Sequence, residues 1–338
     1  MDARTGEVGG LCASAARTTE LGMTARSQRV SLQPSPMRTP VFTFVAINYL
    51  LGIALSLVVG ISGGRSSPFI GLGFGTMLMP ALAVLMVRVT TGEAARIDWA
   101  RVAPRFIPVA LALMPGVLHA TMLPVTAALE GGLPWQDWLI PRGDSLYHSP
   151  DVRGWGVLTS GGLAIRIAIN AVVGLAVVSA LALFEEIGWR AWLLPRLMDR
   201  IGARSAIAAT AVVWALWHIP FALSGIQHLE GVSPTTTALL MPAGVAASGL
   251  IIGWLWVRTE SIWIVALAHG ALNDWGQYAF KYMRDIPVHD QLVALGAGIL
   301  ALLVVGSLLV AFALPSARDG AHTRVEAIGG VPDAARSP

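Results

Sequence analysis

The sequence predicts an all-α membrane protein, a bundle of about eight transmembrane helices with both termini in the cytoplasm. Hydrophobic residues make up 55% of the 338-residue chain and charged residues only 13%, which is too apolar for a water-soluble domain of this length. The apolar residues gather in runs of about 20, the length that crosses the hydrocarbon core of a bilayer. We therefore expect a multi-pass protein of the cell membrane.

Eight apolar runs are long enough to cross the membrane. The predicted spans are Val41–Ile61, Phe69–Val87, Ile107–Leu129, Leu163–Phe184, Ser205–Leu223, Thr236–Val257, Ile262–Phe280 and Leu292–Leu314. Together they define a transmembrane bundle over residues 41–314.

The distribution of arginine predicts the orientation of this bundle. Arg and Lys collect in short cytoplasmic loops. Arginines are frequent before span one, between spans two and three, between spans four and five, and after span eight, and they are sparse in the alternate loops. This pattern places both termini in the cytoplasm. An even number of spans requires the same result, and the two observations are independent.

The two ends of the chain have the composition of disordered cytoplasmic tails. Residues 1–40 are rich in Ser, Thr, Ala, Gly and Arg and lack hydrophobic periodicity, and residues 315–338 form a short polar tail. No long apolar core follows a basic start, so we expect the first span, and not a cleaved signal peptide, to direct insertion. The single cysteine, Cys12, excludes an internal disulfide and a cysteine-based metal site.

The longest extracytoplasmic loop runs from Glu130 to about Ser160 and contains four large aromatic residues. Aromatic side chains of this kind collect at the membrane surface, so the loop is either an interfacial anchor or a lid over a substrate site. The four residues are Trp135, Trp138, Tyr147 and Trp155.

Two adjacent carboxylates, Glu185 and Glu186, end the apolar run of the fourth span. An ionisable group in hydrocarbon costs roughly 2.5 kcal/mol or more, so it is usually paired, faces a wet cavity, or carries function. Arg190 follows Glu186 by one helical turn, which lets these two side chains pair on one face. Glu185 points about 100° away and lacks that partner, so it is the candidate general base.

Three further polar residues lie inside spans five and seven. Span five carries His218, with Trp214 one turn before it, and span seven carries His269 and Asn273 on one helical face. A single buried histidine is usually a hydrogen-bonded core residue. Two carboxylates, two imidazoles and a carboxamide on three separate spans are too costly to bury for packing alone.

This set of side chains supports hydrolysis by either of two routes. A glutamate and a histidine can take a proton from water and pass it to a leaving amine, while a second histidine and an asparagine stabilise the oxyanion. Alternatively, His218, His269 and Glu185 could hold a zinc ion with one open position. The compact His-Glu-x-x-His zinc motif is absent from the sequence, and the cofactor, zinc or none, stays open.

The order of these motifs resembles a known family. The patterns Glu-Glu-x-x-x-Arg, aromatic-x-x-x-His and His-x-x-x-Asn on successive polar spans are similar to those of the CPBP intramembrane endopeptidases, which include the type II CAAX prenyl proteases and the bacterial Abi proteins. The resemblance covers about residues 160–280, the expected catalytic core. The family usually has Phe where this chain has Trp214, and we expect that change to affect only the packing beside His218.

The resemblance implies a helical bundle with a polar cavity that opens toward the cytoplasm. It assigns the general base to Glu185, its partner to His218, the oxyanion donors to His269 and Asn273, and a supporting ion pair to Arg190 with Glu186.

These observations favour an intramembrane endopeptidase that cuts a peptide bond near the cytoplasmic membrane face. Its expected partners are membrane lipid and a peptide or protein substrate, membrane-anchored or prenylated, and not nucleic acid. One alternative is a non-enzymatic immunity or scaffold protein of the same fold. Another is a proton-coupled transporter that relays protons through Glu185, His119, His218 and His269, although no internal repeat supports it.

Overall fold

The computed structural model describes most of the predicted bundle. It describes residues 38–95, 97–132, 139–142, 145–148, 157–159, 165, 168–229, 231–278 and 286–314. All of them belong to one compact unit, Met37–Pro338. The predicted tails fall almost entirely outside the described residues, so their disorder stays a prediction.

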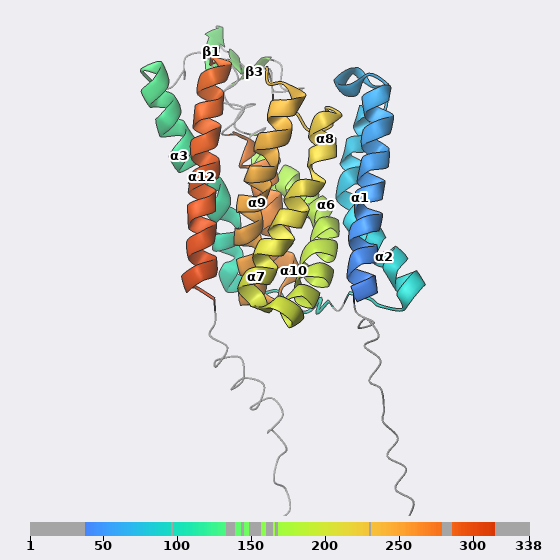
Figure 1. The fold of residues 1–338 in the computed structure, drawn as a ribbon. Helices are drawn as coiled ribbons and strands as arrows, with labels where there is room; N and C mark the ends of the chain where they lie inside the picture. Colours follow the sequence, from blue (N-terminus) through green and yellow to red (C-terminus); the bar gives the residue numbers. More distant parts are fainter. Residues whose placement is uncertain are drawn as a thin grey trace, which may run out of the picture. The chain divides into compact units, whose positions relative to one another are not determined.

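Long helices dominate the described chain and confirm the predicted all-α, multi-pass architecture (Figure 1). The α-helices are α1 (Arg38–Ile61), α2 (Met79–Thr91), α3 (Ile107–Glu130), α6 (Leu175–Gly188), α7 (Leu194–Trp217), α8 (Ile219–Leu223), α9 (Pro234–Thr259), α10 (Ile262–Asp274) and α12 (Val288–Phe312). The 3-10 helices are η1 (Gly64–Ser66), η2 (Ile70–Leu78) and η3 (Pro104–Phe106), and the π-helical turns are η4 (Asn170–Gly174) and η5 (Trp189–Leu193).

Six stretches of the described chain are long and apolar enough to cross a membrane, and one of them, Ala171–Leu223, has 53 residues. A single helix of that length would measure roughly 80 Å, more than twice the hydrocarbon thickness. The helix is interrupted at Gly202, where φ is 76° and ψ is 162°, so the stretch does not form one continuous helix. The exact number of eight spans stays a prediction, since α10 has only 13 residues where a longer span was expected.

Helix α1 begins, and helix α12 ends, at the same end of the bundle (Figure 1). This arrangement agrees with an even number of crossings. Which side of the membrane this end faces is predicted only by the arginine distribution.

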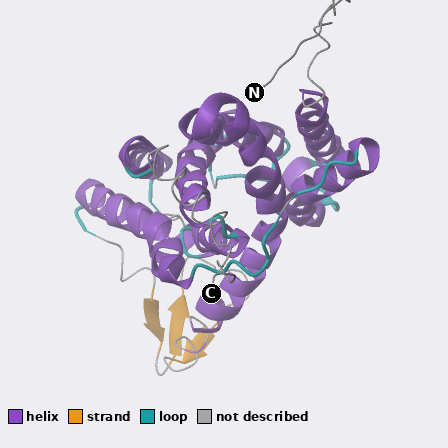
Figure 2. Ribbon diagram, turned by 90° about the horizontal axis from the view of Figure 1, so that it is seen from below, coloured by secondary structure: helices purple, strands orange, loops and turns teal. Residues whose placement is uncertain are grey.

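Three short strands, which the sequence pattern does not predict, interrupt the long loop after α3. The strands β1 (Leu139–Arg142), β2 (Ser145–His148) and β3 (Val157–Thr159) form an antiparallel sheet in the order β1-β2-β3. The sheet lies outside the helices when the bundle is seen from below (Figure 2). Of the four loop aromatics only Tyr147 falls within the described residues, so the choice between anchor and lid stays open.

Glycines let the polar helices approach one another closely. A Cβ atom at Gly270 of α10 would collide with Ser179 of α6, and a Cβ at Gly249 of α9 would lie 2.8 Å from the Cβ of Ala211 on α7. Small residues at such crossings bring helix backbones together. The contact at Gly270 therefore places the preceding residue, His269, directly against α6.

Candidate active site

The acidic pair lies inside α6, and both side chains are buried. Glu185 is 4% exposed and Glu186 is fully buried. The helix does not end at the pair, because the π-helical turn η5, Trp189–Leu193, continues it toward α7. π-Helical turns are rare and are frequent at functional sites.

Glu186 is the anchor of the cluster. Its Oε1 atom accepts a hydrogen bond from Nη1 of Arg190 at 2.9 Å and another from Nδ1 of His269 at 2.8 Å. The first contact is the ion pair that the four-residue spacing predicts. The second joins α10 to α6 and was not predicted. Two donors on one carboxylate oxygen hold Glu186 in a fixed position.

The contact with Glu186 also determines the tautomer of His269. The Glu186 carboxylate, paired with Arg190, can only accept hydrogen bonds, so Nδ1 of His269 must be the donor. Nε2 is the nitrogen that remains available for chemistry, as an acceptor in the neutral ring and as a donor in the doubly protonated ring.

Trp214 connects the two carboxylates. Its indole Nε1 donates a hydrogen bond to Oε2 of Glu185 at 2.8 Å, and the guanidinium carbon of Arg190 lies 4.4 Å from the centroid of its ring. The ring also meets His269 edge-on, with centroids 5.1 Å apart. The expectation that Trp in place of Phe changes only the packing beside His218 is therefore wrong, because phenylalanine has no N–H to donate to Glu185.

His218 caps the end of α7 and is buried. Its Nδ1 lies 2.8 Å from the main-chain oxygen of Trp214, and since a carbonyl only accepts, Nδ1 is the donor. The ring is held edge-on by Trp217, at a centroid distance of 5.2 Å. In the neutral ring Nε2 is unprotonated, so His218 can accept a proton or a hydrogen bond at that atom.

Asn273 lies one turn after His269 on α10, as predicted, but its side chain is less connected to the other candidate site residues than they are to one another. Its side chain is half-buried, and its main-chain carbonyl accepts a hydrogen bond from the side chain of Gln277. Within the described residues, no hydrogen bond joins the Asn273 side chain to Glu185, His218 or His269. Contacts join all the other predicted site residues into one cluster.

Large aromatic side chains enclose the cluster on the side of α1. Phe44 stacks on Trp192 at 4.8 Å and meets Trp189 edge-on at 5.5 Å, and Trp217 donates from Nε1 to the main-chain oxygen of Asn48 at 3.1 Å. These rings are almost completely buried. They keep the surroundings of the charges apolar, which strengthens each electrostatic contact.

The site is closed in this conformation. Glu185, His218 and His269 are 4%, 6% and 3% exposed. Oε2 of Glu186 and Nη2 of Arg190 are buried and lack a hydrogen-bond partner within the described part of the chain. These two atoms retain hydrogen-bonding capacity that a water molecule or a substrate could use.

A zinc site does not fit the arrangement. A zinc ion would need His218, His269 and Glu185 as converging ligands. In the described ranges, no group of three or more His, Cys, Asp or Glu side chains is placed to hold a metal ion. Glu185 is instead turned to Trp214, so a metalloprotease-like site is not supported.

The proton relay of the transporter hypothesis also lacks its fourth member. Nδ1 of His119 lies 2.7 Å from the carbonyl of Pro115 in its own helix, α3. Among the residues that the structure describes, no hydrogen bond links His119 to Glu185, His218 or His269.

Comparison with known proteins agrees with the resemblance in the sequence. Residues 167–274 match the family described as type II CAAX prenyl endopeptidase Rce1-like. The matched segment contains α6, α7, α9 and α10, and with them every candidate site residue. No curated protein matches the chain. Residues 167–274 of this multi-pass membrane protein are therefore similar to the Rce1-like domain of type II CAAX prenyl endopeptidases.

Proposed function

We propose that the protein is an intramembrane endopeptidase in which Glu185 activates a water molecule to cleave a peptide bond of a membrane-anchored substrate. The observation that carries the proposal is that two adjacent buried carboxylates have different hydrogen-bond donors. Glu186 is fixed by Arg190 and His269, whereas Trp214, a neutral group, is the one hydrogen-bond donor to Glu185 among the described residues. Within the described residues, no ion pair holds the charge of Glu185, so this carboxylate is the one that can take a proton from water, as a general base requires.

The reaction follows from this division of roles. Glu185 accepts a proton from water while the water oxygen attacks the carbonyl carbon of the peptide bond. His218 orients that water by accepting a hydrogen bond at Nε2. The proton held by Glu185 then passes to the leaving nitrogen as the C–N bond breaks.

Residues of α10 stabilise the tetrahedral intermediate. An oxyanion needs a donor, so His269 acts in its doubly protonated form, with Nδ1 on Glu186 and Nε2 toward the oxyanion. Asn273, one turn away on the same helix, supplies the second donor from its carboxamide. The positive charges of Arg190 and His269 then accompany the single charge of Glu186, which favours the developing negative oxygen.

Substrate access requires a conformational change, because the three reacting side chains are buried. An extended peptide reaches Glu185 only if α6, α7 and α10 separate locally. A substrate anchored in the membrane approaches from the side through the lipid, and the exclusion of bulk water until it binds suits a site built from buried charges.

A cleavage assay on purified protein tests the proposal. We expect the wild-type chain in detergent to cleave members of a quenched fluorescent peptide library that includes prenylated peptides. Glu185→Gln should lower the rate by about 10²- to 10⁴-fold, the usual contribution of a general base, and a chelator should leave the wild-type rate unchanged. Glu130→Gln, which alters an exposed carboxylate at the end of α3, is the matched control. Wild-type cleavage by Glu185→Gln protein would contradict the assignment.

A further inference from the structure

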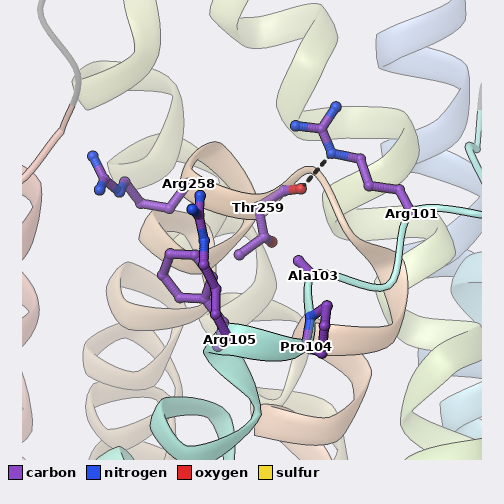
Figure 3. A pocket seen from close by; sticks show the side chains of 7 residues that line it. Arg101, Ala103, Pro104, Arg105, Arg258 and Thr259 are labelled. Carbon is purple, nitrogen blue, oxygen red and sulfur yellow. Dashed lines mark hydrogen bonds between the residues drawn. The ribbon is translucent and has the colours of Figure 1, made fainter.

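A second basic feature lies apart from the candidate active site. A cavity of about 270 Å³ opens where the loop before α3 meets the end of α9 (Figure 3). Arg101, Arg105, Phe106, Arg258 and Thr259 are among its lining residues. None of the candidate catalytic residues borders it, so the catalytic proposal leaves this cavity unexplained.

The three arginines of the cavity differ in their contacts. Arg101 donates from Nε to the main-chain oxygen of Thr259 at 2.7 Å and pairs with Glu260 at 2.7 Å, so it ties the loop to α9. Within the described residues, no acidic side chain pairs with Arg105 or Arg258. These two side chains lie on one side of Thr259 and Arg101 on the other (Figure 3). The cavity therefore retains two positive charges that are free to bind an anion.

The cavity lies at the boundary between hydrocarbon and water. The membrane-crossing stretch Pro104–Glu130 begins at it, and the stretch Pro234–Thr259 ends at it. Close by in the sequence, the Nε1 atom of Trp263 donates to the main-chain oxygen of Trp99 at 2.9 Å, and the two half-exposed rings lie 5.6 Å apart. Tryptophan pairs of this kind are typical of the lipid headgroup region.

The backbone beside the cavity is strained. Ala103 and Glu260 are the non-glycine residues with positive φ in the described chain, at 50° and 48°. Both flank the cavity, one in its lining and the other directly after Thr259. Such conformations persist where the surrounding structure holds them, and they concentrate at binding sites.

We propose that this cavity binds the phosphate of an anionic phospholipid headgroup, with Arg105 and Arg258 as the ligands. A guanidinium group offers two parallel hydrogen bonds to phosphate oxygens, and basic pockets between transmembrane helices bind anionic headgroups. The guanidinium of Arg105 lies 5.3 Å from the ring of Phe106, which gives the glycerol part of the lipid an apolar wall. The position at the membrane boundary favours a lipid over a free anion.

Native mass spectrometry of the full chain tests this assignment. We expect the wild-type protein to retain phosphatidylglycerol in preference to phosphatidylcholine. The double variant Arg105→Gln/Arg258→Gln should bind phosphatidylglycerol at least tenfold more weakly, because each arginine near the surface contributes about 1 kcal/mol. The control Arg88→Gln/Arg200→Gln removes the same charge from exposed positions outside the cavity and should bind as the wild type does. Arg88 lies in the last turn of α2, as Arg258 does in α9.

Two results would overturn the proposal. Equal retention of phosphatidylglycerol by the Arg105→Gln/Arg258→Gln variant and the control would show that the cavity does not bind the lipid. Displacement of phosphatidylglycerol by an equal concentration of inorganic phosphate would assign the cavity to a free anion. Neither measurement depends on proteolysis, so its outcome is separate from that of the endopeptidase proposal.

Discussion

The buried cluster on α6, α7 and α10 and the arginine cavity at the end of α9 both contain charges, but the charges are held in opposite ways. In the cluster, Arg190 and Glu186 are almost completely buried and directly paired. At the cavity, the side chain of Arg101 is 47% exposed and that of its partner Glu260 is 62% exposed, and two further arginines have no acidic partner in the described chain. A buried pair is part of the folded structure, whereas exposed charges are screened by water and remain available to a ligand.

We expect removal of an arginine to lower the free energy of unfolding by very different amounts in the two regions. Arg190→Met leaves Glu186 buried without its ion-pair partner and should lower the free energy of unfolding by about 3 to 5 kcal/mol. The control Arg101→Met breaks an exposed pair and should cost no more than about 1 kcal/mol. Reversible unfolding in mixed micelles measures both. Similar losses for the two variants would show that burial does not distinguish the two pairs.

The close crossing of α6 and α10 gives the next largest effect. Gly270→Ala forces a methyl group against Ser179, so we expect a loss of about 1 to 3 kcal/mol, as for other overpacked cores. Catalysis should fall as well, because the contact between His269 and Glu186 depends on this crossing. Gly296→Ala in α12 is the matched control, since nothing lies within 4 Å of the added carbon. Thermal unfolding and cleavage assays that find both variants equal to the wild type would refute this role for Gly270.

Trp214→Phe should have the smallest effect of the three changes, and we expect it to lower activity. The change keeps an aromatic ring beside Arg190 but removes the hydrogen bond to Glu185. Loss of a hydrogen bond to a charged group is worth about 1.5 kcal/mol or more, so we expect kcat to fall by about tenfold and the pH profile of kcat to shift.

The control for this variant is Trp192→Phe, which deletes a buried indole N–H that has no hydrogen-bond partner in the described chain. A smaller ring at either position loosens the packing, but only Trp214 touches the proposed base. If the two variants have the same kcat and the same pH profile, Trp214 does not position Glu185.

Local spacing predicted part of the site, and contacts between distant segments could not be predicted in the same way. The ion pair of Glu186 with Arg190 follows from a separation of four residues on one helix. The hydrogen bonds of Glu186 with His269 and of Trp214 with Glu185 join residues that are 83 and 29 positions apart. Helical periodicity says which face a residue occupies, but not which other helix packs there.

Some of the missed features do have signals in the sequence. Gly270 directly follows His269, and a glycine inside an apolar helix often marks a close helix crossing. Gly202 lies in the polar stretch between two apolar runs, where the helix is interrupted. The three short strands after α3 have no comparable signal, because they lie in a loop whose aromatic residues are equally suited to the membrane surface.

We propose that the two adjacent glutamates have separate roles, Glu185 in chemistry and Glu186 in structure. The most direct test compares Glu185→Gln with Glu186→Gln in the same preparation, by measuring both the cleavage rate and the free energy of unfolding. We predict that Glu185→Gln folds with nearly wild-type stability and loses cleavage, whereas Glu186→Gln is strongly destabilised, because the neutral amide leaves Arg190 buried without its counter-charge. A stable Glu186→Gln protein without activity, beside an active Glu185→Gln protein, would reverse the assignment of the two roles.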